Sequence, residues 1–222
     1  MRKFAIIAEG ITDQIIIDDI LAGYFNSDDL NVAYFQPSQD ETDINKSGNY
    51  GGWNQVFEHC QPKRLAEALE FNEYIIIQID TDVSDEYYGV PHQNENGELS
   101  VEEIIKLVIE KFKIIIGEEF YSKYHERIIF AIAVHSTECW LLPLYYTDNK
   151  KSKIKNCLVT LNQALTKAGF TIDPNKKNPE YYRNISRKYW KHKFVMSSYQ
   201  HNPSFKIFIE EVEKRKIVLE IC

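Results

Sequence analysis

The segment EYIIIQIDTD, residues 73–82, decides the fold. Its apolar residues follow one another without the alternation of a half-exposed strand, which is typical of a parallel strand buried on both faces. The segment then ends in Asp80, Thr81 and Asp82. Three further short apolar segments, at residues 3–8, 30–35 and 127–134, predict strands of the same kind.

Helical patterns separate these predicted strands. Apolar residues recur at helical spacing over 12–24, 53–71 and 100–116, and Ser100 with Glu103 forms the pattern of a capping box. Pro62 predicts a kink or a split in the second of these helices. Alternating strands and helices of this kind predict an α/β fold, a Rossmann-like parallel sheet flanked by helices on both faces.

The remainder of the chain predicts a helical, basic C-terminal extension. We expect a short apolar helix over 138–146, a basic amphipathic helix over 150–168, and a last helix over 204–216. The domain organisation predicted on this basis is an α/β core over 1–147 and a C-terminal extension over 148–222, packed on the core.

Composition narrows the class of protein. A chain of 222 residues, 44% of them hydrophobic, is long enough to bury one substantial core. No apolar stretch approaches the length of a membrane span, so we expect a protein that is not in a membrane and is located in the cytoplasm. The four cysteines lack the spacing of a zinc site, and we expect them to be reduced thiols.

Charge is distributed unevenly along the chain. The formal charge is −7 overall, with a balance of −17 over residues 1–149 and +10 over residues 150–193. A basic block beside an acidic domain fits a protein in which one part holds cations and another contacts polyanions. A solvated, lysine-rich surface explains the same numbers equally well.

Carboxylates follow the predicted strands at the end where ligands bind in an open parallel sheet. Glu9 follows the first strand, Asp80 and Asp82 follow the third, and Glu138 comes shortly after the fourth. Crowded carboxylates repel one another, and a bound divalent cation removes that penalty. Because the expected ligands are oxygen atoms alone, the sequence predicts Mg²⁺ or Mn²⁺ rather than zinc.

These residues resemble the signature of the Toprim family. Glu9-Gly10 after the first strand resembles the Toprim Glu-Gly, and Asp80-Thr81-Asp82 resembles the Toprim Asp-x-Asp. The resemblance covers residues 1–140 and is greatest to the stand-alone nucleases of the OLD (overcoming lysogenization defect) type. It implies that Glu9 acts as a metal ligand or general acid/base, and that Asp80 and Asp82 bind metal.

The same resemblance implies further site residues. Asp13 occupies the place of a second acid four residues after the glutamate, although it can equally stabilise the start of a helix. Glu138 resembles the glutamate of a Glu-x-Trp segment, and it can also cap a short helix. The OLD-type nucleases use a lysine late in the domain. Lys188, Lys191 and Lys193 are candidates, and Lys191 is the catalytic lysine we predict.

A basic segment rich in aromatic residues runs from Tyr181 to Lys193. Cations neutralise phosphates and exposed rings stack on unpaired bases, so this segment predicts a nucleic-acid surface. Its rings can instead pack inward, which would leave only solvated charges. The predicted contacts are Arg183, Arg187, Lys188, Lys191 and Lys193.

Two functions follow from these features. The first is a metal-dependent nuclease that cleaves phosphodiesters of DNA or RNA, with a role in defence against phage implied by the resemblance. A separate ATPase subunit is implied as well, because the chain has no GxxxxGK[ST] loop. The second is a non-catalytic Toprim-like module that serves binding or assembly with a partner ATPase. His135 at the end of the fourth strand can be catalytic or simply a hydrogen-bonded histidine.

Overall fold

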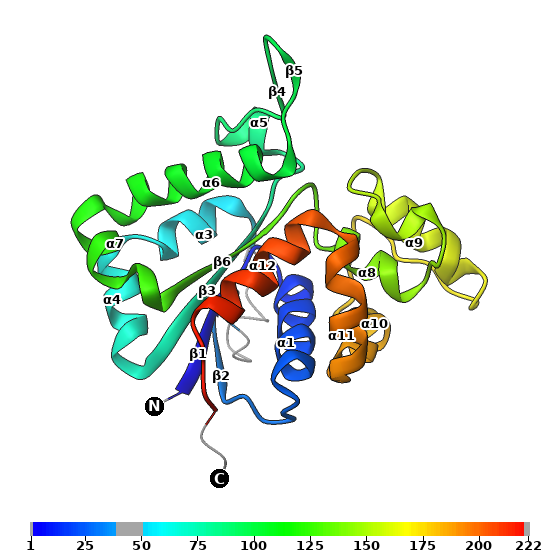
Figure 1. The fold of residues 1–222 in the computed structure, drawn as a ribbon, viewed down its shortest axis with the longest axis horizontal. Coiled ribbons are helices and arrows are strands. Elements are labelled where there is room, and N and C mark those ends of the chain that lie inside the picture. The colour runs from blue at the N-terminus through cyan, green and yellow to red at the C-terminus, as the bar shows by residue number, and fades with distance from the viewer. Residues whose placement is uncertain (1, 39–50, 220–222) are drawn as a thin grey trace.

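A parallel sheet of four strands organises the chain in the computed structural model, which describes residues 2–38 and 51–219. The strands are β1 (Arg2–Ile7), β2 (Val32–Gln36), β3 (Asn72–Asp80) and β6 (Ile128–Ala133), and they lie in the order β2-β1-β3-β6. Every neighbouring pair in this sheet is parallel. The α/β prediction is confirmed, and all four strands lie where the sequence predicts them (Figure 1).

Helices cover both faces of the sheet because successive residues of each strand point to opposite sides. Phe4 and Ile6 belong to one hydrophobic cluster, whereas Ala5 and Ile7 belong to the other. Figure 1 shows the helices of the two clusters on opposite sides of the strands. The first face packs against α1 (Ile11–Phe25) and α12 (Pro203–Lys214), and the second against α3 (Trp53–His59), α4 (Pro62–Phe71) and α6 (Val101–Ile116).

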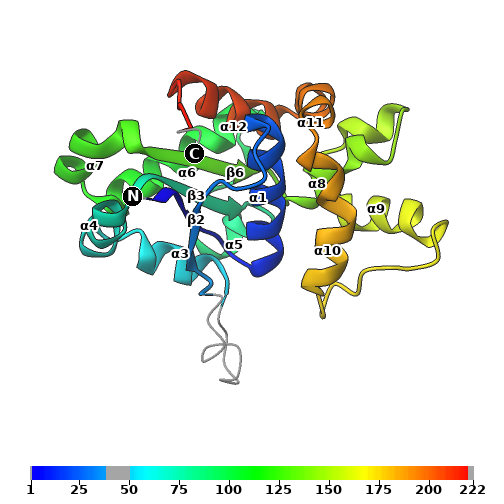
Figure 2. The same ribbon diagram turned by 90° about the horizontal axis from the view of Figure 1, so that it is seen from below.

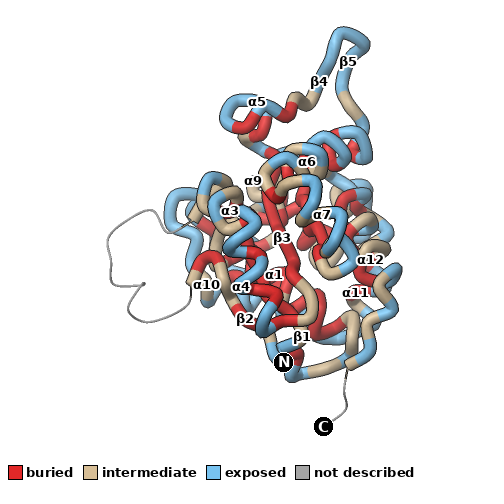
Figure 3. The backbone as a smooth tube through the Cα atoms, turned by 90° about the vertical axis from the view of Figure 1, so that its left-hand side faces the viewer, coloured by how far each residue is buried: buried red, intermediate tan, exposed pale blue. Residues whose placement is uncertain are grey.

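The rest of the described chain consists of shorter elements. They are α5 (Ser84–Tyr87), the hairpin β4 (Gln93–Asn94) and β5 (Gly97–Glu98), α7 (Glu118–Tyr124), η1 (His125–Arg127), α8 (Glu138–Leu141), η2 (Leu142–Leu144), η3 (Asn149–Ser152), α9 (Cys157–Thr166), α10 (Pro179–Ser186), η4 (Arg187–Trp190), α11 (His192–Ser198) and η5 (Tyr199–His201). Strands β1 and β3 are buried, whereas the β4–β5 hairpin projects into solvent (Figure 3).

One helix prediction is confirmed and another needs correction. The segment 53–71 is split into α3 and α4 at Pro62, as this proline predicts, and Pro62 occupies the first position of α4. The basic helix predicted over 150–168 begins only at Cys157. Asn156 adopts a left-handed conformation with φ 56°, which interrupts a helix, and the lysine-rich residues before it form the short η3 turn.

The C-terminal helices pack on the outer side of α1, so this helix is covered on two sides (Figure 2). Gly23 of α1 allows the closest approach, because a Cβ at this position would lie 1.7 Å from the carbonyl oxygen of Tyr189. Residues of both predicted regions share one hydrophobic cluster, from Phe4 in β1 to Phe208 in α12. The boundary at 147/148 stays a prediction.

A disulfide joins Cys139 of α8 to Cys157 of α9. The prediction of reduced thiols is therefore wrong for this pair, because the packing of α8 against α9 brings together two cysteines whose spacing matches no motif. Cys60 is a buried free thiol, and Cys222 lies outside the described residues. Among the helices of residues 2–38 and 51–219, none is both long enough and apolar enough to cross a membrane.

Candidate functional site: a carboxylate pocket at the strand ends

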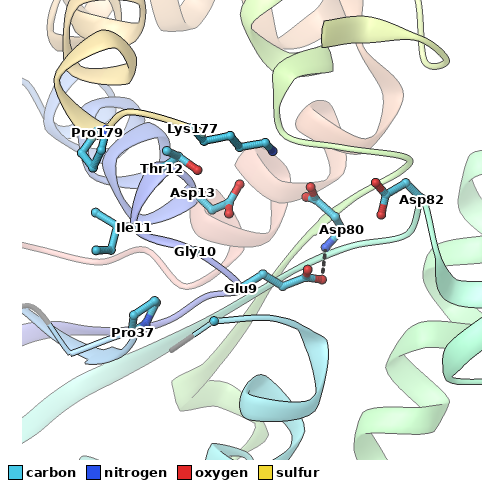
Figure 4. Close-up of a pocket in the computed structure, with 11 residues that line it drawn as sticks. Glu9, Gly10, Ile11, Thr12, Asp13, Pro37, Asp80, Asp82, Lys177 and Pro179 are labelled. Carbon is cyan, nitrogen blue, oxygen red and sulfur yellow. Dashed lines mark hydrogen bonds between the residues drawn. The ribbon is translucent and has the colours of Figure 1, made fainter. Parts of the chain in front are cut away.

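An open pocket of about 420 Å³ lies at the carboxyl ends of β1 and β3. Glu9 enters it from the end of β1, Asp13 from the first turn of α1, and Asp80 and Asp82 from the end of β3 (Figure 4). Lys177, in the loop before α10, reaches in from the opposite side. The parallel sheet therefore brings together four of the acids that the sequence singles out.

Direct hydrogen bonds hold the two strand ends in register. Glu9 accepts a hydrogen bond at Oε1 from the backbone N–H of Asp80, at 2.9 Å. Gln78, a buried polar residue in an otherwise apolar strand, donates from Nε2 to Asp80 Oδ1 at 2.8 Å and accepts from the backbone N–H of Glu9 at 3.1 Å. Glu9 and Asp80 are thus oriented by partners that leave the second oxygen of each carboxylate without a protein hydrogen bond in the described chain.

Thr137, in the turn after β6, connects Asp13 to Asp80. Its hydroxyl donates to Asp13 Oδ1 at 2.5 Å, and its backbone N–H donates to Asp80 Oδ1 at 3.2 Å. Asp13 is buried in the first turn of α1, where a negative charge also stabilises the helix N-terminus. Asp13 therefore both lines the pocket and lies where it stabilises the start of α1, and its role as a metal ligand stays a prediction.

Lys177 forms an ion pair with Glu138, whose side chain is almost fully buried. The ammonium lies 2.8 Å from Glu138 Oε1, and the Lys177 side chain is 34% exposed against 2% for Glu138. Tyr182 of α10 donates its hydroxyl hydrogen to the same oxygen. Lys177 and Tyr182 thus hold Glu138, which does not itself line the pocket, whereas Lys177 does.

Burial changes the protonation of the pocket. Burial, followed by the charge of Asp13, raises the pKa of Glu9 to about 8. Burial likewise raises the pKa of Asp13 to about 6 and that of Asp80 well above its ordinary value. Burial opposes ionisation of Glu138 too, but the Lys177 ammonium lowers its pKa below the ordinary value. Among the described residues a single ammonium, that of Lys177, therefore lies near more carboxylates than its one charge can balance.

The donor set fits a hard divalent cation. All the acids that line the pocket offer oxygen, and no histidine or cysteine lines it among residues 2–38 and 51–219. As the side chains stand, no group of three or more Asp, Glu, His or Cys residues within 2–38 and 51–219 could hold a metal ion. A cation would therefore require small side-chain movements, for which the free oxygens of Glu9 and Asp80 and the exposed side chain of Asp82 are available.

The late lysine lies elsewhere than predicted. Lys191 is exposed and precedes His192, whose Nδ1 lies 3.1 Å from the carbonyl oxygen of Gly23 near the C-terminal end of α1. The pocket is at the N-terminal end of α1, roughly 18 Å away at 1.5 Å per helical residue. Lys188 and Lys193 lie in the same distant segment and do not line the pocket, whereas Lys177 does.

The basic segment exposes its cations but only some of its rings. Tyr181 and Trp190 are each 42% exposed, whereas Tyr182 and Tyr189 are buried. The Arg187 guanidinium stacks 5.6 Å from the centroid of the Trp190 ring. The five predicted nucleic-acid contacts all lie at the surface: Arg183, Arg187, Lys188, Lys191 and Lys193.

A second pocket of about 330 Å³ adjoins the first, since Asp82 lines both. It contains two histidines, His92 and His135, whose rings meet edge to face with centroids 4.7 Å apart. Burial and the neighbouring His92 lower the pKa of His135 to about 4. His135 is therefore a neutral imidazole near pH 7 and not a solvated cation.

Sequence reasoning missed three residues of the site. Gln78 gave a signal, since a lone glutamine inside an apolar strand needs a buried hydrogen-bond partner. Lys177 and Tyr182 gave none, because a loop lysine and one tyrosine among several have no distinguishing spacing. Only the path of the chain from α9 to α10 brings them to Glu138.

Comparison with known proteins adds no relative to this description. No protein-family model, no curated protein and no solved structure gives a significant match to this chain.

Proposed function

We propose that this chain is a metal-dependent nuclease that hydrolyses nucleic-acid phosphodiesters at the carboxylate pocket. The observation that carries the proposal is the convergence of Glu9, Asp13, Asp80 and Asp82 with Lys177 in one open pocket. Glu9 follows β1, Asp13 lies in the first turn of α1, and the other two acids come from the end of β3. Their order and spacing resemble those of the Toprim nucleases.

The roles of the residues follow from their surroundings. Glu9, Asp13, Asp80 and Asp82 would hold Mg²⁺ or Mn²⁺, which when bound supplies an activated water and neutralises charge at the phosphate. Burial raises the pKa of Glu9 to about 8 without a bound cation, so a cation that Glu9 ligates would displace its proton. Lys177 keeps its ammonium charged, and so offsets negative charge that develops on the phosphate.

The basic surface supports a polyanionic substrate. Arg187 and Trp190 present a stacked cation and ring, and Tyr181 lies two residues beyond Pro179, which lines the pocket. Cations along a strand offset the repulsion that an acidic pocket exerts on phosphates. By resemblance, the proposal extends to defence against phage with an ATPase on a separate chain.

The test is a cleavage assay with plasmid, single-stranded DNA and total tRNA, in Mg²⁺, Mn²⁺ or EDTA. We expect metal-dependent cutting that falls at least roughly 100-fold in Asp80→Asn, as expected when an essential ligand is removed. Asp28→Asn is the matched control, since Asp28 is exposed and far from the pocket in the loop after α1. Equal cutting by wild type and Asp80→Asn would rule out this pocket as the catalytic site.

One observation favours the second candidate function, a non-catalytic binding module. Lys177 already places a positive charge beside Glu138, Asp13 and Asp80, as a resident cation would. A module of this kind would assemble with a partner ATPase without cutting. The absence of cleavage with every metal and substrate, together with stable copurification of an ATPase, would favour it over the nuclease.

A further inference from the structure

The main chain at the start of α3 lies directly against Glu9. Gly52 is the N-cap of α3, and Gly51 before it lines the carboxylate pocket. A Cβ added at Gly51 would lie 2.4 Å from the carbonyl oxygen of Glu9, a separation that real side chains do not adopt. Glycine at this position therefore allows the two backbones to approach so closely.

Glu9 belongs to neither the sheet nor a helix, so its backbone needs partners from elsewhere. β1 ends at Ile7 and α1 begins at Ile11. The Glu9 N–H donates to the side chain of Gln78 at 3.1 Å, and the Glu9 carbonyl accepts from the N–H of Gly52 at 2.8 Å. The position of Glu9 therefore depends on the start of α3 as well as on β3.

Asp80 extends beyond the paired part of β1. The last residue of β1, Ile7, is paired with Ile77, three positions before Asp80 in β3. The carbonyl oxygen of Asp80 accepts a hydrogen bond from the hydroxyl of Tyr88 at 2.6 Å, and Tyr88 is buried. A side chain from outside the sheet thus holds the backbone of this carboxylate residue.

Tyr88 packs against the aromatic residues of α3. Its ring centroid lies 5.9 Å from that of Trp53 and 5.4 Å from that of Phe57. Val56 of the same helix is fully buried in the hydrophobic cluster that contains Ile79 of β3. One helix, anchored in the core, therefore supports the backbone of Glu9 directly and that of Asp80 through Tyr88.

We propose that α3 is the element that positions the carboxylates of the pocket, with Gly51 and Tyr88 as positioning residues. Gly51 permits the contact that fixes Glu9, and Tyr88 is the donor that fixes Asp80. The inference rests on the proposed function for the role of these two carboxylates. Removing a residue that orients a metal ligand typically lowers metal affinity roughly 10- to 100-fold.

Two small changes remove one contact each. Gly51→Ala adds a single methyl group, for which the Glu9 carbonyl leaves no room. Tyr88→Phe removes the hydroxyl and keeps the ring that packs on α3. Asn54→Ala is the matched control, because Asn54 is an exposed residue of the same helix.

Amide hydrogen exchange in EDTA measures the positioning without any metal. The N–H of Asp80 donates to Glu9 Oε1, and the N–H of Gly52 donates to the Glu9 carbonyl. In Gly51→Ala we expect both amides to exchange roughly fivefold faster, as the loss of about one hydrogen bond implies. The amide of Ile76, buried in the middle of β3, should be unaffected, because only a loss of overall stability would accelerate it.

Tyr88→Phe should give a different exchange pattern. The Asp80 amide should exchange faster and the Gly52 amide should not, because Tyr88 contacts the Asp80 backbone and not that of Glu9. Asn54→Ala should match the wild type at both amides.

Mn²⁺ affinity then tests whether the positioning acts on the pocket. Gly51→Ala and Tyr88→Phe should each weaken binding roughly tenfold. Gly51→Ala should cause no further loss in a Glu9→Gln background. Likewise, Tyr88→Phe should cause no further loss in an Asp80→Asn background. A merely structural role would instead give additive losses.

The outcomes separate this inference from the proposed function. Unaltered exchange at Asp80 in both variants, or additive losses of Mn²⁺ affinity in both backgrounds, would overturn the inference. The expected exchange patterns without Mn²⁺ binding or cleavage by the wild type would contradict the proposed function alone. Metal-dependent cleavage by the wild type, with exchange unaltered in both variants, would contradict this inference alone.

Discussion

The two edges of the sheet both hold charged side chains, but only one edge compensates them. At the amino edge, the Arg127 guanidinium donates to the carbonyl oxygens of Leu69, Asn72 and Glu73 at 2.7 to 2.9 Å. Lys3 pairs with the Glu73 carboxylate at 2.7 Å. Each charge there has partners that satisfy it, as expected of a structural ion pair.

At the carboxyl edge, negative charge exceeds the positive charge that could compensate it. Glu9, Asp13 and Asp80 have raised pKa values because they are buried close together, and Lys177 is the one ammonium that lines their pocket in the described part of the chain. Such an arrangement lowers stability, and it persists in proteins mainly where a ligand makes use of it. The comparison teaches that the amino edge stabilises the fold, whereas the carboxyl edge carries the uncompensated charge on which the proposed function rests.

Removing the ammonium should have the largest effect. Lys177→Met should lower the cleavage rate roughly 100- to 1000-fold, about 3 to 4 kcal/mol, by removing a charge that stabilises the transition state. The same change should tighten Mn²⁺ binding, because the carboxylates lose a competing cation. Cleavage kinetics and calorimetry of Mn²⁺ binding measure the two effects in Lys177→Met. The control is Lys176→Met, at the neighbouring exposed lysine. Parallel loss of metal binding and cleavage would show instead that Lys177 only supports the fold.

Removing the guanidinium at the other edge should affect stability alone. Arg127→Met leaves three backbone carbonyls without their donor and should lower the free energy of unfolding by about 2 kcal/mol. Urea unfolding measures this, with Arg64→Met as control because the Arg64–Glu58 pair is exposed and 3.7 Å long. Mn²⁺ affinity should be unchanged in Arg127→Met, and a substantial change would break the distinction between the two edges.

The pH dependence of stability should reveal the uncompensated carboxyls. Glu9 has a folded-state pKa of about 8 against an ordinary value of 4.5, so the folded protein binds more protons than the unfolded chain between these values. The free energy of unfolding should therefore fall as pH rises from 4.5 to 8 in EDTA. The part due to Glu9 should be about 1 to 2 kcal/mol, allowing for its partial exposure.

Glu9→Gln isolates this contribution. The variant should show a shallower fall in urea-unfolding stability over the same pH range, with the remaining slope due to the other buried acids, among them Asp13, Asp80 and Asp19. A slope identical to that of wild type, or a stability that rises with pH in this range, would mean that Glu9 is not buried as a protonated acid.

The basic segment should contribute the smallest effect per residue. Arg187→Gln should weaken binding of single-stranded nucleic acid a few-fold and reduce the slope of log affinity against log salt by about 1. Lys63→Gln, at an exposed lysine of α4, serves as control. If both variants behave like wild type, the charges of the segment are only solvated.

The sequence predicted most of the fold because the strands are apolar throughout. Residues such as Ile75, Ile76 and Ile77 are buried on both faces of the sheet, and that requirement is visible in a single strand. The start of α9 was not visible, since a left-handed residue such as Asn156 leaves no mark on hydrophobic periodicity. The hairpin over 93–98 was also missed, because its exposed polar residues resemble a loop.

The sequence likewise predicted some residues of the candidate site and missed others. Glu9, Asp80 and Asp82 follow strands, so sheet geometry alone brings them to one edge. Lys177 comes from a loop whose position depends on how α9 and α10 pack, and local sequence carries no record of that packing. Lys191 looked equally suitable by charge, yet it lies at the far end of α1.

Metal binding tests the central claim most directly. Mn²⁺ titrations followed by electron paramagnetic resonance would compare wild type with Glu9→Gln, Asp80→Asn and the control Asp28→Asn. The account predicts saturable binding in wild type and Asp28→Asn, and a loss of at least roughly tenfold in affinity in each pocket variant. Absence of binding in wild type, or equal binding in all four proteins, would contradict it.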